Sequence, residues 1–241
     1  MDAMKKPGRS VELLQKMASA LVPFRRTFRS VCQEVVRTHG VEAWFDGTPW
    51  QRPYAREAIR LASRWGDSSL PVHDVGCGIA QMIVLLRRAG FHDLSGCDRE
   101  ANHVAAAKDL CARFGVPAAI TLADGVDYVR SLPPQGAGLI LALNWTYNLN
   151  PSQTKEFLLH AARALEPRRG MLVVDIIRSD YIPPRNEKQE YETSYPNKWT
   201  GNAFEDSVAG AGLALQARGA IHAWGRVVYA LGPASAQKSP R

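Results

Sequence analysis

Acidic residues and glycines stand where the chain passes from one strand-like run into the next helix. Gly76 and Gly78 lie in PVHDVGCGIAQMIVLLRRAG, between a strand-like run and a helical one. A glycine-rich turn that opens a helix is typical of phosphate and ligand sites. Asp98 ends the next strand-like run, and Asp124 ends the one after it. An acid at the end of the second strand commonly accepts hydrogen bonds from ribose hydroxyls, so the pattern predicts a nucleotide-like ligand.

The glycine spacing does not fit a dinucleotide. That fingerprint requires glycine at positions 76, 78 and 81, and position 81 is Gln. Because its third glycine permits close packing of the helix on the strand, Gln81 argues against NAD and FAD. The sequence also lacks a Walker-type phosphate loop, which argues against ATP and GTP. An NAD-dependent oxidoreductase is therefore disfavoured.

The elements that must position these residues begin near residue 71, where strand-like and helical runs start to alternate. This alternation is typical of βαβ units, so we expect an α/β, doubly wound, mostly parallel seven-stranded sheet that is Rossmann-like. Strands are expected near 71–75, 93–97, 118–122, 137–143, 170–177, 213–221 and 224–231. Helices are expected near 79–89, 100–114, 125–131, 152–165 and 203–211.

The segment before the sheet shows helical patterns and no good strand, which predicts an N-terminal helical cap over residues 1–66. Two helices are expected over 10–40, with Ser10 capping the first and Pro23 starting the second. A third is expected near 53–65, after the aromatic stretch AWFDGTPWQRPYA.

The predicted sheet domain covers residues 67–232. It contains a polar and aromatic insertion at 178–202 that is too long for a plain connection and is typical of a functional loop. Residues 233–241 are expected to form a flexible tail.

Composition is that of an ordinary globular protein, with 46% hydrophobic and 22% charged residues among 241. No apolar run approaches the roughly 20 residues of a membrane span. The four cysteines form no pair with metal-ligand spacing, so we expect reduced, mostly buried thiols and no metal site. These observations predict a cytoplasmic protein with no membrane partner.

The formal net charge of +7 is unevenly placed. Residues 1–30 hold seven Lys or Arg against two acidic residues, and 238–241 add two more basic residues, so that 31–237 carries no net charge. A nucleic-acid enzyme usually carries its basic surface on the folded body. Nucleic acid is therefore a disfavoured partner, and we expect the basic residues at the two ends to form a solvated face. The protein is expected to be a monomer or homodimer.

Taken together over about residues 71–231, the motifs resemble those of class I S-adenosylmethionine-dependent methyltransferases. The family's first motif is a strand ending in an acid followed by G-x-G-x-G, and it stands here as VHDVGCGIA at 72–80. Ala80 replaces the third glycine, which should be tolerated if position 80 is already helical. Later motifs match at Asp98, at Asp124-Gly125 and at LNWTYN, residues 143–148.

The resemblance implies S-adenosylmethionine as cofactor and a set of residues around it. Asp74 would meet the ammonium group or shape the turn, Asp98 would hold the ribose diol, and Asp124 would accept from the adenine amino group. The alternative for Asp124 is a helix N-cap, since DGVDYV is also typical of a helix start. The full set of expected cofactor contacts is Asp74, Gly76, Cys77, Gly78, Asp98, Arg99, Asp124, Gly125 and Asn144.

The acceptor side is expected to be formed by the segment after the fourth strand, the insertion and the aromatic cap. Its candidates are Asn144, Trp145, Tyr147 and Tyr54, together with Trp50 and Arg52. Methyltransferases acting on exocyclic amines carry (D/N)-P-P-(Y/F) after that strand, and here Trp145 and Thr146 replace both prolines. None of the six histidines stands out, so no catalytic base is assigned.

A cap and a long insertion favour an enclosed pocket, which suits a small acceptor. The leading hypothesis is therefore methyl transfer to an O or N atom of a small molecule, including a secondary metabolite. Two alternatives stay open. One is an RNA or protein methyltransferase using the basic N-terminal helix, and the other is a catalytically inactive cofactor-binding module.

Overall fold

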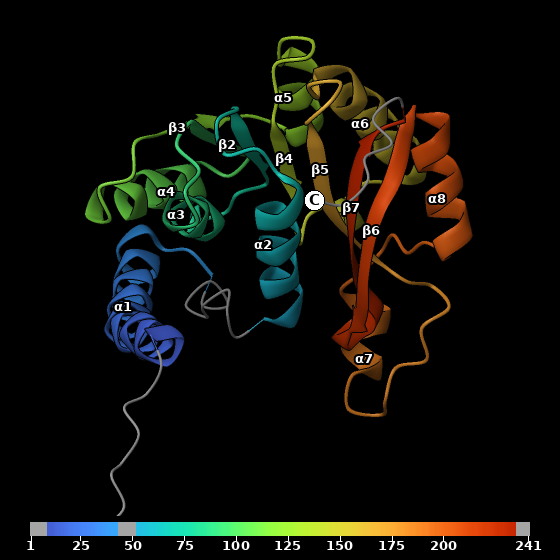
Figure 1. Cartoon of the computed structure of the whole chain (residues 1–241). Helices are drawn as coiled ribbons and strands as arrows, with labels where there is room; N and C mark the ends of the chain where they lie inside the picture. Colours follow the sequence, from blue (N-terminus) through green and yellow to red (C-terminus); the bar gives the residue numbers. More distant parts are fainter. Residues whose placement is uncertain (1–8, 43–51, 235–241) are drawn as a thin grey trace, which may run out of the picture.

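The computed structural model of the chain describes residues 9–42 and 52–234 (Figure 1). In this part of the chain seven strands form one sheet: β1 (Val72–Val75), β2 (Leu94–Asp98), β3 (Ala118–Leu122), β4 (Leu139–Ala142), β5 (Met171–Ile177), β6 (Leu213–His222) and β7 (Arg226–Pro233). The helices that accompany them are α1 (Arg9–His39), α2 (Pro53–Trp65), α3 (Gln81–Arg88), α4 (Ala101–Arg113), α5 (Gly125–Ser131), α6 (Pro151–Ala164), α7 (Lys188–Thr193) and α8 (Gly201–Gly210).

The sheet has the strand order β3-β2-β1-β4-β5-β7-β6. The pairs among β1 to β5 are parallel, and β7 runs antiparallel to both β5 and β6. The expected α/β, mostly parallel seven-stranded fold is confirmed, and each strand lies within two residues of its expected bounds. The order reverses between β1 and β4, so the crevice for a ligand is expected at the carboxyl ends of those two strands.

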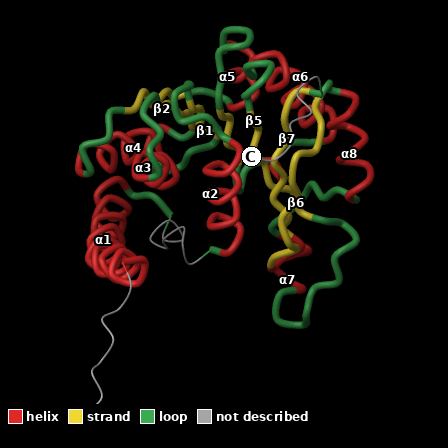
Figure 2. Tube along the Cα trace, in the orientation of Figure 1, coloured by secondary structure: helices red, strands yellow, loops and turns green. Residues whose placement is uncertain are grey.

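Helices cover both faces of this sheet (Figures 1 and 2). Neighbouring residues of one strand serve opposite faces: Leu139 and Leu141 belong to a cluster with α1 to α4, whereas Ile140 and Ala142 belong to a cluster with α5, α6 and α8. Central strands such as β5 are therefore buried on both sides, and the β5 sequence MLVVDII is apolar except for Asp175.

The N-terminal segment differs from its prediction. A single helix, α1, runs through Pro23, and Ser10 stands inside it instead of capping it. A proline within a helix removes one backbone hydrogen bond. The second half of α1 compensates by packing, because Phe28, Cys32 and Val35 are fully buried in the cluster that includes the sheet.

The insertion after β5 folds against the ends of β5 and β7. It contains the short helix α7 and three tyrosines that form a small apolar cluster with Ile177 and Trp224. The 3₁₀ turn Ala223–Gly225 between β6 and β7 is held to the insertion by Glu187, whose carboxylate accepts from the Trp224 N–H at 2.9 Å.

The division into cap, sheet domain and tail stays a prediction, and most of the tail, 235–241, lies outside the described residues.

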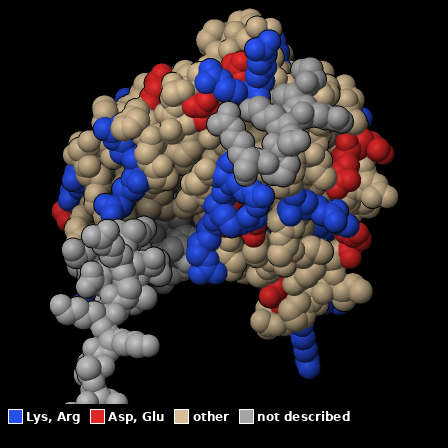
Figure 3. Space-filling model, viewed as in Figure 1, with Lys and Arg blue, Asp and Glu red and all other residues tan. Residues whose placement is uncertain are grey.

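The surface charge is locally concentrated although the body carries no net charge. Basic side chains gather over α2 on the face seen in Figure 3. The helix places Arg56, Arg60 and Arg64 four residues apart, and all three are exposed.

None of the described helices combines the length and apolar character needed to cross a bilayer.

Candidate cofactor site

A cavity of about 320 Å³ lies at the carboxyl ends of β1 and β4, where the strand order reverses. Its wall is formed by the loops after β1, β2, β3 and β4, and by the start of α2. The residues predicted from the sequence to face cofactor or acceptor line it: Asp74, Gly76, Cys77, Gly78, Asp98, Arg99, Asp124, Gly125, Asn144, Trp145, Tyr147, Tyr54 and Arg52. The structure thus brings these residues together, and their individual contacts with a ligand stay predictions.

The turn after β1 has three residues in the left-handed region. Gly76 has φ of 67°, Gly78 has φ of 53°, and Ala80 has φ of 62°. The expectation that position 80 is helical is wrong, because Ala80 is the left-handed N-cap of α3. A non-glycine residue in this conformation destabilises the folded state by about 1–2 kcal/mol. Ala80, which replaces the third glycine of G-x-G-x-G, is therefore strained.

Two glycines of the cavity make room for one side chain. A Cβ at Gly76 would overlap one end of the Trp145 indole, and a Cβ at Gly125 would overlap the other. The indole also packs edge-on against Phe157 of α6, with ring centroids 5.2 Å apart. Trp145 therefore spans the floor between the glycine turn and the start of α5, beside the residue expected next to adenine.

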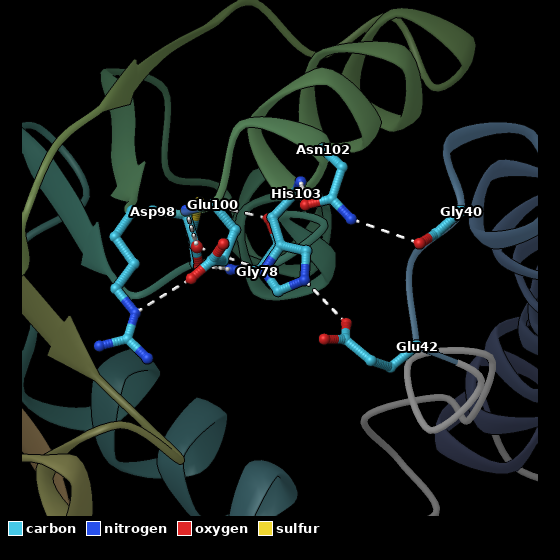
Figure 4. A network of polar contacts seen from close by, with 9 residues as sticks. Gly40, Glu42, Gly78, Asp98, Glu100, Asn102 and His103 are labelled. Carbon is cyan, nitrogen blue, oxygen red and sulfur yellow. Dashed lines mark hydrogen bonds and ion pairs between the residues drawn. The ribbon is translucent and has the colours of Figure 1, made fainter.

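Asp98 is nearly buried and firmly held. Its Oδ2 accepts from the Gly78 N–H at 2.9 Å, and its Oδ1 accepts from the Glu100 N–H at 3.0 Å. Its Oδ1 also lies 3.2 Å from Nδ1 of His103 (Figure 4). Burial opposes ionisation of this carboxyl, but the hydrogen bonds from His103, Glu100 and Gly78 outweigh it and lower its pKa.

His103 is the main site residue that the sequence patterns did not reveal. Its side chain is only 8% exposed and lines the cavity. The available signal was its spacing, because the fifth residue after a strand-end acid lies in the first turn of the following helix, next to that acid.

Asp74 is almost fully buried beneath the turn, at 3% exposure. No donor among the described residues reaches its Oδ2. Burial, and then the nearby charge of Asp98, raise the pKa of Asp74 to about 8. A buried carboxylate without a donor fits a cationic ligand group, because a bound ammonium would supply the missing hydrogen bond.

Asp124 and Arg99 complete the expected nucleobase side. Asp124 caps α5 through Oδ1, which accepts from the N–H groups of Val126 at 2.8 Å and Asp127 at 3.3 Å. The prediction of an N-cap is thus confirmed, and the cap uses only one carboxylate oxygen. Arg99 is largely exposed at the cavity mouth and pairs with Glu100 at 3.2 Å.

The opposite end of the cavity rests on a buried ion pair. Asp175 of β5 pairs with Arg226 of β7, and both side chains are 1% exposed. The other oxygen of Asp175 accepts from the Asn144 N–H at 2.7 Å, which fixes the exit from β4. There Asn144 adopts a left-handed φ of 56°.

Tyrosines surround this ion pair. The Arg226 guanidinium lies 4.4 Å from the ring centroid of Tyr54 and 5.7 Å from that of Tyr147. Tyr195 from the insertion packs edge-on against Tyr147, with centroids 5.0 Å apart. Burial raises the pKa of Tyr147 to about 12, so its phenol stays protonated at neutral pH and can donate a hydrogen bond. Of the expected acceptor-side residues, Trp50 lies outside the described residues.

No family model matches the chain, and no curated protein matches it by sequence. Solved structures do match its fold. The geranyl diphosphate C-methyltransferase from Streptomyces coelicolor A3(2) has a TM-score of 0.61 and 11% identity, with 76% of this chain and 80% of that chain covered. The magnesium protoporphyrin IX methyltransferase ChlM from Synechocystis PCC 6803, with bound SAM, has a TM-score of 0.55 and 14% identity, with 76% and 79% covered.

The chain has the class I methyltransferase fold. The 4+2 cyclase SpnF is a third match, with a TM-score of 0.54 and 20% identity over 68% of this chain and 58% of that chain. The structural similarity establishes the methyltransferase fold. Because the sequence identities are this low, it does not establish a shared reaction. The chemistry of the site must therefore be argued from its own residues.

Proposed function

We propose that this protein is an S-adenosylmethionine-dependent methyltransferase that methylates an O or N atom of a small molecule. The observation that carries the proposal is the donor and acceptor set at the switch point of the sheet. An ionised carboxylate, Asp98, is held by the glycine turn. A buried carboxyl, Asp74, lies 24 residues earlier in the chain beneath the same turn, and its Oδ2 has no hydrogen-bond partner among the described residues.

The residues fit the parts of this cofactor. Asp98 has accepting capacity left for a ribose hydroxyl, Asp74 would accept from the methionine ammonium, and the free oxygen of Asp124 would accept from the adenine amino group. Trp145 would form an apolar wall beside the ring. When bound, the cofactor supplies an electrophilic methyl group on a sulfonium. The chain's own task is then to hold the acceptor in line with that bond and to exclude water.

The acceptor end supports a small-molecule substrate. Tyr54 and Tyr147 offer aromatic edges and phenol donors there, and the Asp175–Arg226 pair fixes them from behind. Planar or apolar molecules pack well on such a wall, while a phenol O–H can orient one polar group. A walled cavity of this kind suits a metabolite, which includes secondary metabolites, better than a macromolecule.

Calorimetric titration with S-adenosylhomocysteine tests the cofactor. We expect micromolar or tighter binding by the wild type and at least tenfold weaker binding by Asp98→Ala, because a charge-assisted hydrogen bond is lost. NAD and ATP serve as control ligands and should not bind. Equal affinity of Asp98→Ala and wild type would refute the role of Asp98, and no binding by the wild type would refute the proposed cofactor.

Turnover must be tested separately, because a cyclase shares the fold. S-adenosylhomocysteine formation should be followed by mass spectrometry over a panel of phenols, amines and carboxylic acids. We expect Tyr147→Phe to bind the cofactor normally and to turn over more slowly. Product formation only with RNA or protein would replace the small-molecule proposal, and cofactor binding without transfer to any acceptor would favour a non-methylating module.

A further inference from the structure

His103 stands between two carboxylates that come from distant parts of the chain (Figure 4). Its Nδ1 lies 3.2 Å from Oδ1 of Asp98, and its Nε2 lies 2.8 Å from Oε2 of Glu42. A neutral imidazole has one N–H and can donate to only one of these oxygens. Both contacts together require the imidazolium form, and the hydrogen bond to Asp98, followed by that to Glu42, raises the pKa of His103 despite its burial.

The contact fixes Asp98 in its ionised form and in one orientation. Oδ1 of Asp98 accepts from His103 and from the Glu100 N–H, so both of its lone pairs are used. Oδ2 accepts only from the Gly78 N–H among the described residues, which leaves one acceptor position on that oxygen. Asp98 is therefore set with a single defined lone pair for a ligand hydroxyl in the cavity.

Glu42 brings the end of α1 into this arrangement. Along the same interface, the Gly40 carbonyl accepts from Asn102 at 3.3 Å, and His39 pairs with Asp109 at 3.1 Å. The His103–Glu42 contact lies at the cavity end of this row, where Glu42 itself lines the cavity. The His103 imidazolium thus contributes both to the docking of α1 on α4 and to the orientation of Asp98.

We propose that His103 is a positioning residue for the cofactor's ribose, and that with Glu42 it couples docking of α1 to cofactor binding. The inference rests on the proposed function. Among the described residues, the charged groups facing the imidazole are Asp98 from β2 and Glu42 after α1, while Arg99 and Glu100 nearby pair with each other. Above the pKa of His103 the imidazole keeps one of its two contacts, so the orientation of Asp98 loosens.

The test compares S-adenosylhomocysteine affinity of the wild type and His103→Gln at pH 5.5 and pH 9. We expect the variant to bind about tenfold more weakly at pH 5.5, because it lacks an ionic hydrogen bond to Asp98. The ratio of the two dissociation constants should shrink at pH 9, where the wild type has lost its imidazolium. Asp74 titrates in both proteins, so its effect on affinity cancels in the ratio of the two dissociation constants.

The matched control is His39→Gln, which removes a histidine–carboxylate pair from the same interface without touching Asp98. It should leave the affinity at both pH values within about twofold of wild type. A second readout needs no cofactor. The ring resonance of His103, assigned by its absence in His103→Gln, should titrate above the ordinary range in the wild type and at lower pH in Glu42→Gln.

The outcomes separate the two proposals. If the wild type binds and the His103→Gln ratio is one at both pH values, the positioning role is wrong while the proposed function stands. The positioning role is also wrong if His39→Gln reproduces the ratios, since the effect would then be general loosening of α1. If His103 titrates identically in Glu42→Gln, the coupling to α1 is wrong. A wild type that does not bind at all refutes the proposed function, and the ribose role falls with it.

Discussion

Asp74 is the carboxyl of the cavity whose environment is least suited to a negative charge. Its folded-state pKa of about 8 lies above the ordinary value of an aspartate, so the folded state binds a proton that the unfolded state has released. Ionising Asp74 therefore destabilises the cofactor-free protein progressively as pH rises from about 4 to about 8. A bound ammonium would reverse this preference and expel the proton.

Asp74→Asn should therefore be more stable than the wild type to urea at pH 8, with the difference shrinking toward pH 4. Calorimetry of S-adenosylhomocysteine binding in two buffers of different ionisation enthalpy should show more proton release near pH 7 by the wild type than by the variant. Equal stability of the two proteins at both pH values would contradict the unpartnered, protonated state of Asp74.

At Gly125 the indole of Trp145 leaves no room for a side chain. Gly125→Ala should cost about 1–3 kcal/mol of unfolding free energy by overpacking and should change the tryptophan fluorescence of the folded state. Gly210→Ala is the control, since a Cβ there meets nothing within 4 Å, and it should not lower stability by more than about 0.5 kcal/mol. Equal effects of the two substitutions in urea unfolding would show that Trp145 does not limit position 125.

At the scale of elements, the Asp175–Arg226 pair joins three segments: β5, β7 and the exit of β4. Arg226→Met leaves a buried carboxylate unpaired and should cost about 3–5 kcal/mol, because the desolvation of Asp175 is no longer compensated. Arg130→Met, which breaks an exposed pair with Glu156, should cost less than about 1 kcal/mol. Denaturant unfolding measures the stability of both variants. If Arg226→Met lowers the unfolding free energy by less than about 1 kcal/mol, the ion pair does not hold these strands together.

At the scale of the whole molecule, α1 shares one hydrophobic cluster with the sheet. Phe28→Ala should therefore lower the stability of the whole protein by about 3–5 kcal/mol in a single transition, seen together by circular dichroism and tryptophan fluorescence. The control Leu159→Ala, at an exposed position on α6, should have little effect. A separate early transition in Phe28→Ala, with the main one unchanged, would instead support a cap over 1–66 that unfolds independently.

The sequence by itself determined the sheet and the ring of residues around its crevice. Strand periods, glycines and strand-end acids are local signals, and parallel strands bring their carboxyl ends to one edge, so the predicted residues had to meet. The length of α1 was mispredicted, because packing of Phe28 and Val35 outweighed the local signal of Pro23.

Only the tertiary structure decided the environment of each residue. The pairing of His103 with Glu42, the pairing of Asp175 with Arg226 and the indole against Gly125 join positions 61, 51 and 20 residues apart. No local pattern encodes such contacts, because they depend on which side chains the crossovers bring into one buried space. Asp74 and Asp98 are both buried, and the hydrogen-bond donors that reach Asp98 but not Oδ2 of Asp74 decide which carboxyl is ionised.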